Sequence, residues 1–418
     1  MTHSNAQPLI RSTPAGSAVT EPGSQRLCVL TMIDGLMTAG AETVATRIAL
    51  GLDPGRFESI ICSTRPSARH QVKAARAAGV EVLELGRKSK VDVWRWRPLI
   101  GLLRSGRVDV LHAHKFGSNL WAALLKPRGR LPVLLAHEHS WSYEGTLRRV
   151  VDRDLIARRA AAVVAVSPTD RLRMIELERI PPEKVVYVPN GIPDRPVGDP
   201  QYVRRELGLT PSNWVVGTVC GLRPEKELET ALRALARLAP HRPALRFLVV
   251  GDGLERPRLE RLADELGVPT TFLGHRPNDE VPDLLAAMDV LVLSSRFEGM
   301  PLAVLEWMAA GKAIVASRVG GIPTIVEDRK EALLVPPRDY VSFADAIGRL
   351  LDDPAERQRL GEAAQRRQRE QFRLEQSIEQ LESLYEKLYA EGTQEPAAGH
   401  RSPRSRKPGG HAGPPETG

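Results

Sequence analysis

The chain has 418 residues, which is more than one ordinary hydrophobic core needs, so two domains with flanking tails are expected. Its three cysteines, Cys28, Cys62 and Cys220, lie singly in apolar, strand-like stretches, which excludes a close pair for metal binding and predicts buried thiols. No run of about 18 apolar residues occurs, and the N-terminus lacks an apolar core of signal-peptide length. We therefore expect a cytoplasmic protein.

The net charge of +8 is unevenly placed along the chain. Between residues 87 and 159 there are 16 Lys and Arg against 6 Asp and Glu, a net of +10, and Trp94-Arg95-Trp96-Arg97 lies in this segment. Such a segment fits an anionic membrane surface, on the inner face of the cell membrane, or an acidic acceptor. A solvated basic surface is the alternative. No nucleic-acid-reading motif accompanies the charge, so no nucleic-acid partner is expected.

Apolar, β-branched runs alternate with helical patterns along most of the chain. The first set covers residues 27–32, 59–62, 80–85, 108–111, 133–136, 162–166 and 185–188. After a turn-rich stretch to about residue 211, the second set covers residues 215–219, 246–250, 270–273, 290–293, 313–316 and 332–335. Strands that alternate with helices predict an α/β fold with two doubly wound parallel sheets facing a cleft.

We therefore divide the chain into domains at residues 26–195 and 196–374. Residues 1–25 lack apolar periodicity and residues 391–418 are rich in Pro, Gly and Arg, so both ends are expected to be disordered. One late pattern crosses the division. Ile378, Leu381 and Tyr385 belong to an apolar stripe that predicts a helix over residues 375–390, which must dock on something. We expect it to return to the first domain.

Two carboxylates, Glu298 and Glu306, stand eight positions apart across a predicted loop-to-helix junction. Pro301 suits the first position of that helix and Gly311 suits its end. Glu298 then lies on the loop and Glu306 in the second helical turn. The backbone N–H groups of the first turn attract phosphate, so the pair predicts a site for a sugar nucleotide. An ordinary solvated helix start is the alternative.

Other loops could contribute to such a site. Gly40, in a turn that leads through Glu42 into a helix, lets the backbone approach a phosphate. Arg223 and Lys226 follow the strand at 215–219 and could neutralise a leaving diphosphate. Gly251-Asp252-Gly253 lacks the third glycine of a dinucleotide fingerprint, which disfavours a hydride-transfer enzyme.

His112 and His114 share one sheet face at the end of a strand, where a histidine can serve as a hydrogen-bond donor or as an acid or base. A structural role is the alternative, and His137 and His139 after the next strand carry the same ambiguity. No third ligand is in view beside them, so no metal site is expected. Asp152-Arg153-Asp154 lies in a helical pattern and is expected to be surface charge.

From about Leu27 to Leu388 the chain resembles the retaining glycosyltransferases of the GT-B fold, group 1. Glu298 to Glu306 matches the E-x7-E signature of that family. Gly40-Ala41-Glu42, Asp109 to His114, Val164 to Ser167 and Pro189 to Ile192 match further family segments in order and spacing.

The resemblance implies transfer of a hexose-type sugar from a UDP-, GDP- or ADP-sugar to a glycan, lipid-linked or small-molecule acceptor, in a pathway such as polysaccharide biosynthesis. It further implies retention of the anomeric configuration, no metal and no cofactor besides the donor. By position, Glu298 contacts sugar hydroxyls, Glu306 contacts the ribose, and His114 lies beside the transferred sugar. Glu42 and His137 fall on the acceptor side. The remaining donor-binding positions are Gly40, Gly299, Met300, Pro301 and Leu302.

One departure concerns the leaving group. The family usually reads Gly-Arg-Leu before its lysine, whereas this chain reads Cys220-Gly221-Leu222. Arg223 is expected to supply the missing guanidinium beside Lys226. Without it, leaving-group stabilisation would rest on Lys226 and helix dipoles, and turnover would be slow.

Two other functions fit the same architecture. A sugar-nucleotide epimerase would interconvert donors without an acceptor. A weakly catalytic sugar-nucleotide-binding scaffold at a membrane would fit the missing arginine and the basic segment.

Overall fold

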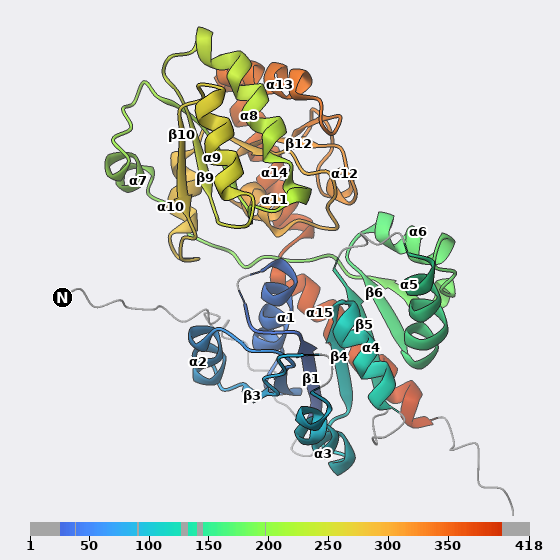
Figure 1. Cartoon of the computed structure of the whole chain (residues 1–418). Coiled ribbons are helices and arrows are strands. Elements are labelled where there is room, and N and C mark those ends of the chain that lie inside the picture. Colours follow the sequence, from blue (N-terminus) through green and yellow to red (C-terminus); the bar gives the residue numbers. More distant parts are fainter. Residues whose placement is uncertain are drawn as a thin grey trace, which may run out of the picture.

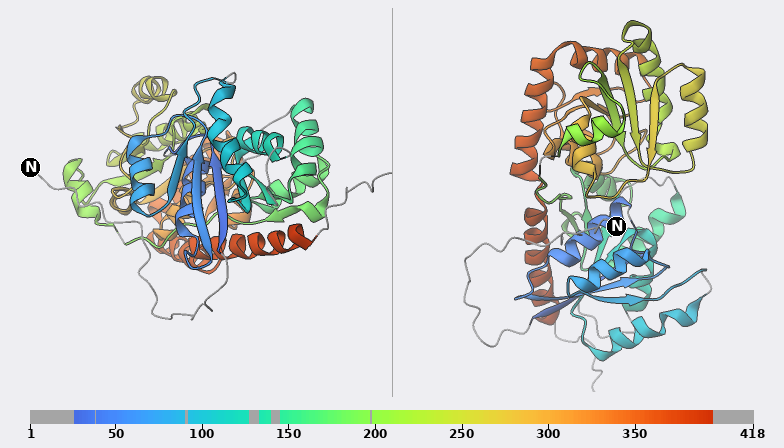
Figure 2. Two further views of the ribbon diagram at one scale, coloured as in Figure 1. Left: turned by 90° about the horizontal axis from the view of Figure 1, so that it is seen from below. Right: turned by 90° about the vertical axis from the view of Figure 1, so that its left-hand side faces the viewer.

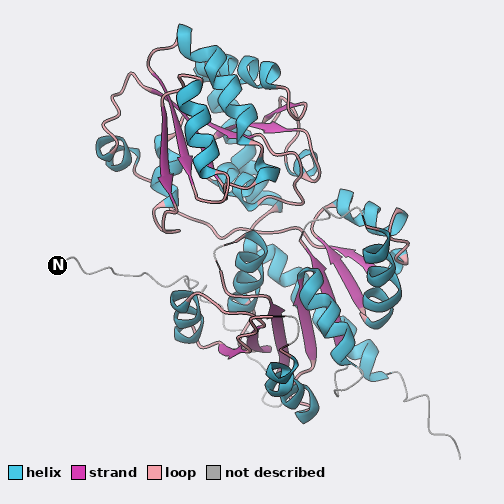
Figure 3. Ribbon diagram, viewed as in Figure 1, coloured by secondary structure: helices cyan, strands magenta, loops and turns pink. Residues whose placement is uncertain are grey.

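The computed structural model describes residues 26–37, 39–89, 92–126, 133–139, 145–196 and 198–394. The ends expected to be disordered lie outside these residues, except that residues 391–394 belong to the last helix instead. The chain forms two lobes, each a sheet with helices on both faces (Figures 1 and 3). This arrangement confirms the predicted α/β fold class.

The first lobe is built on a seven-stranded parallel sheet in the order β3-β2-β1-β4-β5-β6-β7. Its strands are β1 Leu27–Ile33, β2 Phe57–Ser63, β3 Glu81–Glu84, β4 Val110–His114, β5 Val133–Glu138, β6 Ala162–Ala165 and β7 Val185–Tyr187. Its helices are α1 Gly40–Gly51, α2 Arg69–Ala77, α3 Arg97–Ser105, α4 Lys115–Leu125, α5 Thr146–Val151 and α6 Pro168–Glu176. The strand order reverses between β1 and β4, where doubly wound sheets bind ligands.

The second lobe is built on a six-stranded parallel sheet in the order β10-β9-β8-β11-β12-β13. Its strands are β8 Trp214–Val219, β9 Leu245–Val250, β10 Thr270–Gly274, β11 Val290–Leu293, β12 Ala313–Ser317 and β13 Leu333–Val335. Its helices are α7 Pro200–Glu206, α8 Leu228–Leu238, α9 Arg256–Glu265, α10 Val281–Ala287, α11 Leu302–Ala309, α12 Ile322–Ile325, α13 Tyr340–Asp352 and α14 Pro354–Gln371. The strand order reverses again, between β8 and β11.

Burial on both faces explains why these sequences form strands. All four residues of β11, Val290–Leu293, are buried, as expected for a parallel strand covered by helices on each side. Each fully buried Val or Leu stabilises the fold by about 1.5–3 kcal/mol relative to an exposed side chain. Every strand predicted from the sequence is present in the structure, and the observed ends differ from the predicted ends by at most three residues.

The last helix, α15 Leu374–Gln394, crosses from the second lobe back to the first. Figure 2 shows α14 and α15 running along one side of both lobes. Ile378, Leu381 and Tyr385 are buried in one cluster with residues of β1, β4 and β5. The return of this helix to the first lobe, predicted from its apolar stripe, is confirmed.

The crossover between the lobes packs against the start of α15. The Ile192 N–H donates to the Phe372 carbonyl at 3.1 Å, and the Leu374 N–H donates to the Ile192 carbonyl at 3.0 Å. A Cβ at Gly191 would lie 2.5 Å from the Arg373 carbonyl oxygen, so only glycine fits this approach. The two chain segments that join the lobes are thus held together.

Three sequence-based expectations need correction. Pro301 is the N-cap of α11 rather than its first helical residue, because α11 begins at Leu302. Asp152 is not surface charge: it is buried, Arg148 lies 3.3 Å away, and burial raises the pKa of Asp152 to about 6. Cys28 and Cys62 are buried as predicted, but Cys220 is only partly buried.

No helix within the described parts of the chain combines the length and the apolar character needed to cross a membrane.

Truncation of the α15 contact should destabilise the first lobe. Leu381 is fully buried, so we expect Leu381→Ala to lower the free energy of unfolding by about 2–5 kcal/mol, through lost burial and the cavity left behind. Chemical denaturation followed by tryptophan fluorescence would measure it. Lys387→Ala, an exposed change on the same helix, is the control. Equal stability of the two variants would show that α15 does not support the lobe.

Candidate functional site

A cavity of about 1710 Å³ lies between the lobes, at the C-terminal ends of the strands. Its first-lobe wall includes Gly40, Glu42, Arg47, Lys115 and His139. Its second-lobe wall includes Arg223, Lys226, the loop from Glu298 to Leu302, and Glu306. All of the positions predicted to bind the donor therefore line one cavity, although they come from distant parts of the sequence.

Glu298 is held at the floor of this cavity by two partners. Lys226 Nζ and Ser295 Oγ each lie 2.6 Å from Glu298 Oε1, and the glutamate is only 8% exposed. Burial acts to lower the pKa of Lys226, but the charge of Glu298 and its hydrogen bond outweigh this and raise the pKa. Lys226 is therefore a cation paired with an anion inside the site.

A pair of glycines supports the loop that carries Glu298. Gly320 has a φ of +52°, and a Cβ there would lie 1.8 Å from the Glu298 carbonyl oxygen. A Cβ at Gly321 would lie 2.0 Å from the Gly299 carbonyl oxygen. Side chains at either position would push the loop away, so the glycines fix where Glu298 stands. Our sequence reasoning missed them, although Gly-Gly after the strand at 313–317 is a turn signal.

The N-terminus of α11 faces the cavity directly after this loop. Met300, Pro301, Leu302 and Ala303 all line it. The Asn190 side-chain amide donates to the Met300 carbonyl at 3.1 Å, which ties this turn to the crossover segment. The first N–H groups of a helix have no partners within the helix, and with the helix dipole they favour an anion.

Gly40 starts α1 on the opposite wall. A Cβ there would meet no atom within 4 Å among the described residues, so protein packing does not demand a glycine. Because Gly40 lines the cavity and carries no side chain, a ligand could approach the start of α1 closely.

Glu306 points toward two arginines. Its Oε1 lies 3.2 Å from Arg47 Nη2 of α1 and 3.7 Å from Arg195 Nη2 of the crossover segment. The side chains of Arg47 and Glu306 are 11% and 18% exposed. Sequence reasoning could not find Arg47, because it stands 259 positions from Glu306 and lies in no motif.

Arg223 lines the cavity but is not buried in it. Its side chain is 60% exposed, and its partner Glu225 lies 4.0 Å away. Arg223 therefore stands at the rim of the cavity, whereas the Lys226 side chain is only 18% exposed.

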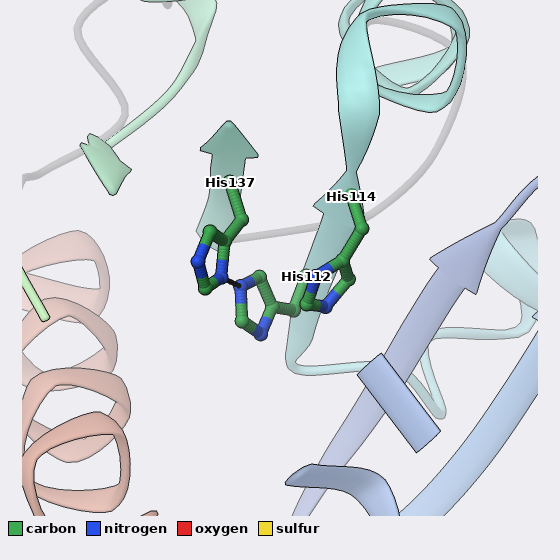
Figure 4. Close-up of side chains that lie close together, drawn as sticks. All are labelled: His112, His114 and His137. Carbon is green, nitrogen blue, oxygen red and sulfur yellow. Dashed lines mark hydrogen bonds between the residues drawn. The ribbon is translucent and has the colours of Figure 1, made fainter. Parts of the chain in front are cut away.

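Four histidines stack beneath the first-lobe wall, and Figure 4 shows three of them. His112 and His137 approach with Nε2 and Nδ1 3.1 Å apart, and His112 Nδ1 lies 2.6 Å from the Tyr385 hydroxyl. His114 Nδ1 lies 2.9 Å from His139 Nε2. Only His139 of this stack lines the cavity, while His114 and His137 are fully buried below it. The resemblance implied a place beside the transferred sugar for His114, which the structure buries beneath the cavity wall rather than in its lining.

One nitrogen from each of His112, His114 and His137 lies within 4.8 Å of the others, a spacing that three metal ligands could have. The third ligand that the sequence did not reveal comes from the neighbouring strand, because His114 pairs in register with His137. However, His112 Nε2 and His137 Nδ1 already form a hydrogen bond with each other, so neither of these two nitrogens has a free lone pair for a metal. His139 is supported by a hydrogen bond with the ring of His114 and by stacking on His137, with ring centroids 4.3 Å apart.

Glu42 is nearly buried at the first-lobe wall and accepts a hydrogen bond from Lys115 Nζ at 2.8 Å. Lys115 has a φ of +70°, an uncommon conformation for a residue with a side chain. Such strain costs on the order of 1–3 kcal/mol and tends to occur at functional sites. Lys115, at the C-terminal end of β4, is a cavity cation that our sequence reasoning missed.

Acid should destabilise the histidine stack. Burial lowers the pKa of His137 from 6.5 to about 3, and it holds the pKa values of His112, His114 and His139 well below 6.5. The unfolded chain therefore binds protons that the folded chain excludes, so the stabilising contribution is complete above pH 6.5 and is lost as the pH falls toward 3. Each histidine adds up to about 1.4 kcal/mol per pH unit in this window.

We expect the melting temperature to fall from pH 7 to pH 5, and to fall less in His139→Gln, because one fewer proton is taken up on unfolding. His70→Gln changes an exposed histidine on α2 and should leave the wild-type slope unchanged. Calorimetry across this pH range measures the difference. Identical slopes for all three proteins would contradict a buried, uncharged stack.

Comparisons with known proteins agree with this geometry. Residues 201–367 match the family profile of the glycosyl transferases group 1, and residues 38–195 match that of glycosyltransferase family 4. The chain is 32% identical to the D-inositol 3-phosphate glycosyltransferase of Stackebrandtia nassauensis over 62% of this chain and 64% of that protein. The corresponding enzyme of Thermobispora bispora is also 32% identical, over 61% of this chain and 67% of that protein. The first of these matches spans less than two thirds of its relative.

Solved structures show the same fold. HepE of Anabaena in complex with UDP-glucose superposes with a TM-score of 0.78 at 21% identity, over 87% of this chain and 100% of that one. Sucrose-phosphate synthase of Thermosynechococcus elongatus superposes with a TM-score of 0.73 at 21% identity, over 88% of this chain and 100% of that one. The chain therefore belongs to the group 1 glycosyltransferases, and its two-lobed architecture is the GT-B fold.

Proposed function

We propose that this protein is a retaining glycosyltransferase that moves a hexose-type sugar from a nucleotide-diphospho-sugar to an acceptor hydroxyl. The observation that carries the proposal is the partly buried Lys226–Glu298 pair beside the N-terminus of α11. It combines a cation, a fixed helix dipole and a hydrogen-bond acceptor at one point of the cavity. Those are the groups that a diphosphate joined to a sugar requires.

The donor would lie along the second-lobe wall. Its diphosphate meets the first turn of α11 and Lys226, with the backbone at Gly40 opposite. Glu306 accepts hydrogen bonds from the ribose hydroxyls, and Glu298 accepts them from the sugar. Binding of UDP-glucose by HepE, a protein of the same fold, supports a nucleotide-sugar donor.

Breaking the glycosyl–phosphate bond develops positive charge on the sugar and negative charge on the diphosphate. Once the donor is bound, Lys226 and the N-termini of α1 and α11 stabilise the negative charge on the diphosphate. The acceptor oxygen attacks from the face that the diphosphate leaves, so the anomeric configuration is retained. Closure of the two lobes around the donor excludes water that would otherwise hydrolyse it.

The acceptor would occupy the first-lobe wall. Lys115 and His139 line this part of the cavity, so the wall offers a cation and an imidazole to a polar acceptor. The relatives from S. nassauensis and T. bispora are named for D-inositol 3-phosphate. We therefore add small polyol phosphates to glycans and lipid-linked sugars as candidate acceptors.

Substitution of Glu298 tests the proposal. We expect Glu298→Gln to lower kcat/KM by about 10- to 100-fold, since a hydrogen bond to a charged group contributes about 1.5–3 kcal/mol. Glu306→Gln should chiefly raise the donor KM, because its contact is with the ribose. Release of nucleoside diphosphate from UDP-, GDP- and ADP-glucose, with an acceptor panel that includes D-inositol 3-phosphate, provides the assay. Glu260→Gln, outside the cavity, is the control. Turnover at the wild-type rate by Glu298→Gln would rule out the assignment.

We also propose that the basic segment attaches the protein to an anionic membrane surface. Trp94 is 69% exposed and Leu147 is 79% exposed, and both lie close to arginines in the sequence. Trp96, in contrast, is buried against Trp121 with ring centroids 4.6 Å apart, so it has a structural role. Only part of the Trp-Arg alternation is free to meet lipid.

Sedimentation with phosphatidylglycerol vesicles tests this attachment. At low salt we expect the protein to sediment with the vesicles, and Trp94→Ala to weaken the association several-fold because an interfacial aromatic anchor is lost. Salt should release the protein by screening. Tyr202→Ala, an exposed aromatic on the other lobe, is the control. Wild-type protein that stays in the supernatant at low salt would disprove the membrane partner.

A further inference from the structure

The guanidinium of Arg47 occupies an unusual position for a helix side chain. It extends from α1 of the first lobe to Glu306 of the second, and both residues line the cavity. Arg47 Nη2 lies 3.2 Å from Glu306, while Arg47 Nη1 is buried without a hydrogen-bond partner among the described residues. A buried, unpaired N–H of a charged group is costly, so this one needs an explanation.

The local charge balance points the same way. Among the described residues, Arg47 and Arg195 are both paired with one carboxylate, Glu306, so two cations face one anion there. Burial lowers the pKa of Arg47, Glu306 opposes this, and Arg195 adds to it. Arginine stays protonated nonetheless, because its ordinary pKa lies far above neutrality. The cluster therefore presents a cation that an anionic ligand would satisfy.

The direction of the side chain makes a phosphate the fitting ligand. Side chains on a helix lean toward its N-terminus, so Arg47 leans along α1 toward Gly40. Glu306 similarly lies one turn beyond Leu302 at the start of α11. Arg47 thus contacts the glutamate assigned to the ribose and lines the same cavity as the two helix N-termini assigned to the diphosphate.

We propose that Arg47 supplies, from the opposite lobe, the guanidinium contact to the donor diphosphate that the second lobe lacks at Gly221. The inference rests on the proposed function. Arg223 is a weaker candidate for this contact, because its side chain is 60% exposed at the cavity rim. The Arg47 side chain is only 11% exposed and is already paired with Glu306, so little further ordering is required when the donor binds.

In the transfer step, the bond between the anomeric carbon and the diphosphate oxygen breaks, and its electron pair stays on that oxygen. The acceptor oxygen forms the new bond to the anomeric carbon, and the acceptor proton passes to the departing diphosphate. Arg47 donates hydrogen bonds to the diphosphate and neither gains nor loses a proton. Because it belongs to the first lobe, its contact also couples diphosphate binding to closure of the lobes.

Calorimetric titration tests this contact without a known acceptor. Affinities for UDP, GDP and ADP are compared with those for the matching nucleosides, so that the ratio isolates the diphosphate. We expect Arg47→Met to weaken binding of the preferred diphosphate by about 10- to 100-fold with nucleoside affinity unchanged, the loss typical of one charged hydrogen bond. Arg47→Lys keeps the charge but loses the planar guanidinium, so its affinity for the diphosphate should lie between those of the wild type and Arg47→Met.

Arg223→Met should have a smaller effect than Arg47→Met. Arg367→Met removes a comparably buried ion pair outside the cavity, with Glu331 at 3.5 Å, and controls for lost stability. An unchanged ratio in Arg47→Met, or equal weakening of nucleoside and diphosphate, would overturn the assignment, since Arg47 would then only position Glu306. If the wild-type protein bound none of the three diphosphates, the proposed function itself would fail.

Discussion

The structure depends on two ion pairs in the walls of the cavity, each of which holds a glutamate against a cation. Glu298 is paired with Lys226, and Glu306 is paired with Arg47. Taking a carboxylate out of water is expensive, and a partner cation with further hydrogen bonds offsets that cost. Each pair also joins separate elements: the first joins two loops of one lobe, and the second joins α1 to α11 across the cavity. The charges thus hold the cavity walls in place before any ligand arrives.

The same pairs explain how a donor could bind without leaving charges unmatched. A nucleotide-diphospho-sugar brings negative phosphates and neutral hydroxyls. The phosphates can pair with the cations, and the hydroxyls can donate hydrogen bonds to the carboxylates. Every buried charge then exchanges one partner for another, and the net cost of the exchange is small. The glycines behind the Glu298 loop and the crossover contact at Asn190 hold the backbone of that loop in place during this exchange.

Much of the fold could be predicted because its signals are local. Runs such as Val290–Leu293 are apolar and β-branched, and the α15 stripe has helical spacing, so strand order along the chain and the returning helix follow from pattern alone. The donor loop was also predictable, since Glu298 and Glu306 lie within one motif. Local patterns do not predict contacts between residues that are far apart in the sequence. Arg47 meets Glu306 only after both lobes fold, and nothing in its neighbours marks it. Local patterns also do not show how deeply a side chain is buried. His114 is the last residue of β4 and His139 directly follows β5, yet of these two only His139 lines the cavity.

Exchange of partners at Glu298 is the central claim, and a crystal structure with the nucleotide sugar that most raises the melting temperature would test it most directly. Lys226 Nζ, now 2.6 Å from Glu298, should move into contact with a donor phosphate, and Glu298 should accept a hydrogen bond from a sugar hydroxyl. A bound donor that leaves the Lys226–Glu298 pair intact and its sugar away from Glu298 would contradict it.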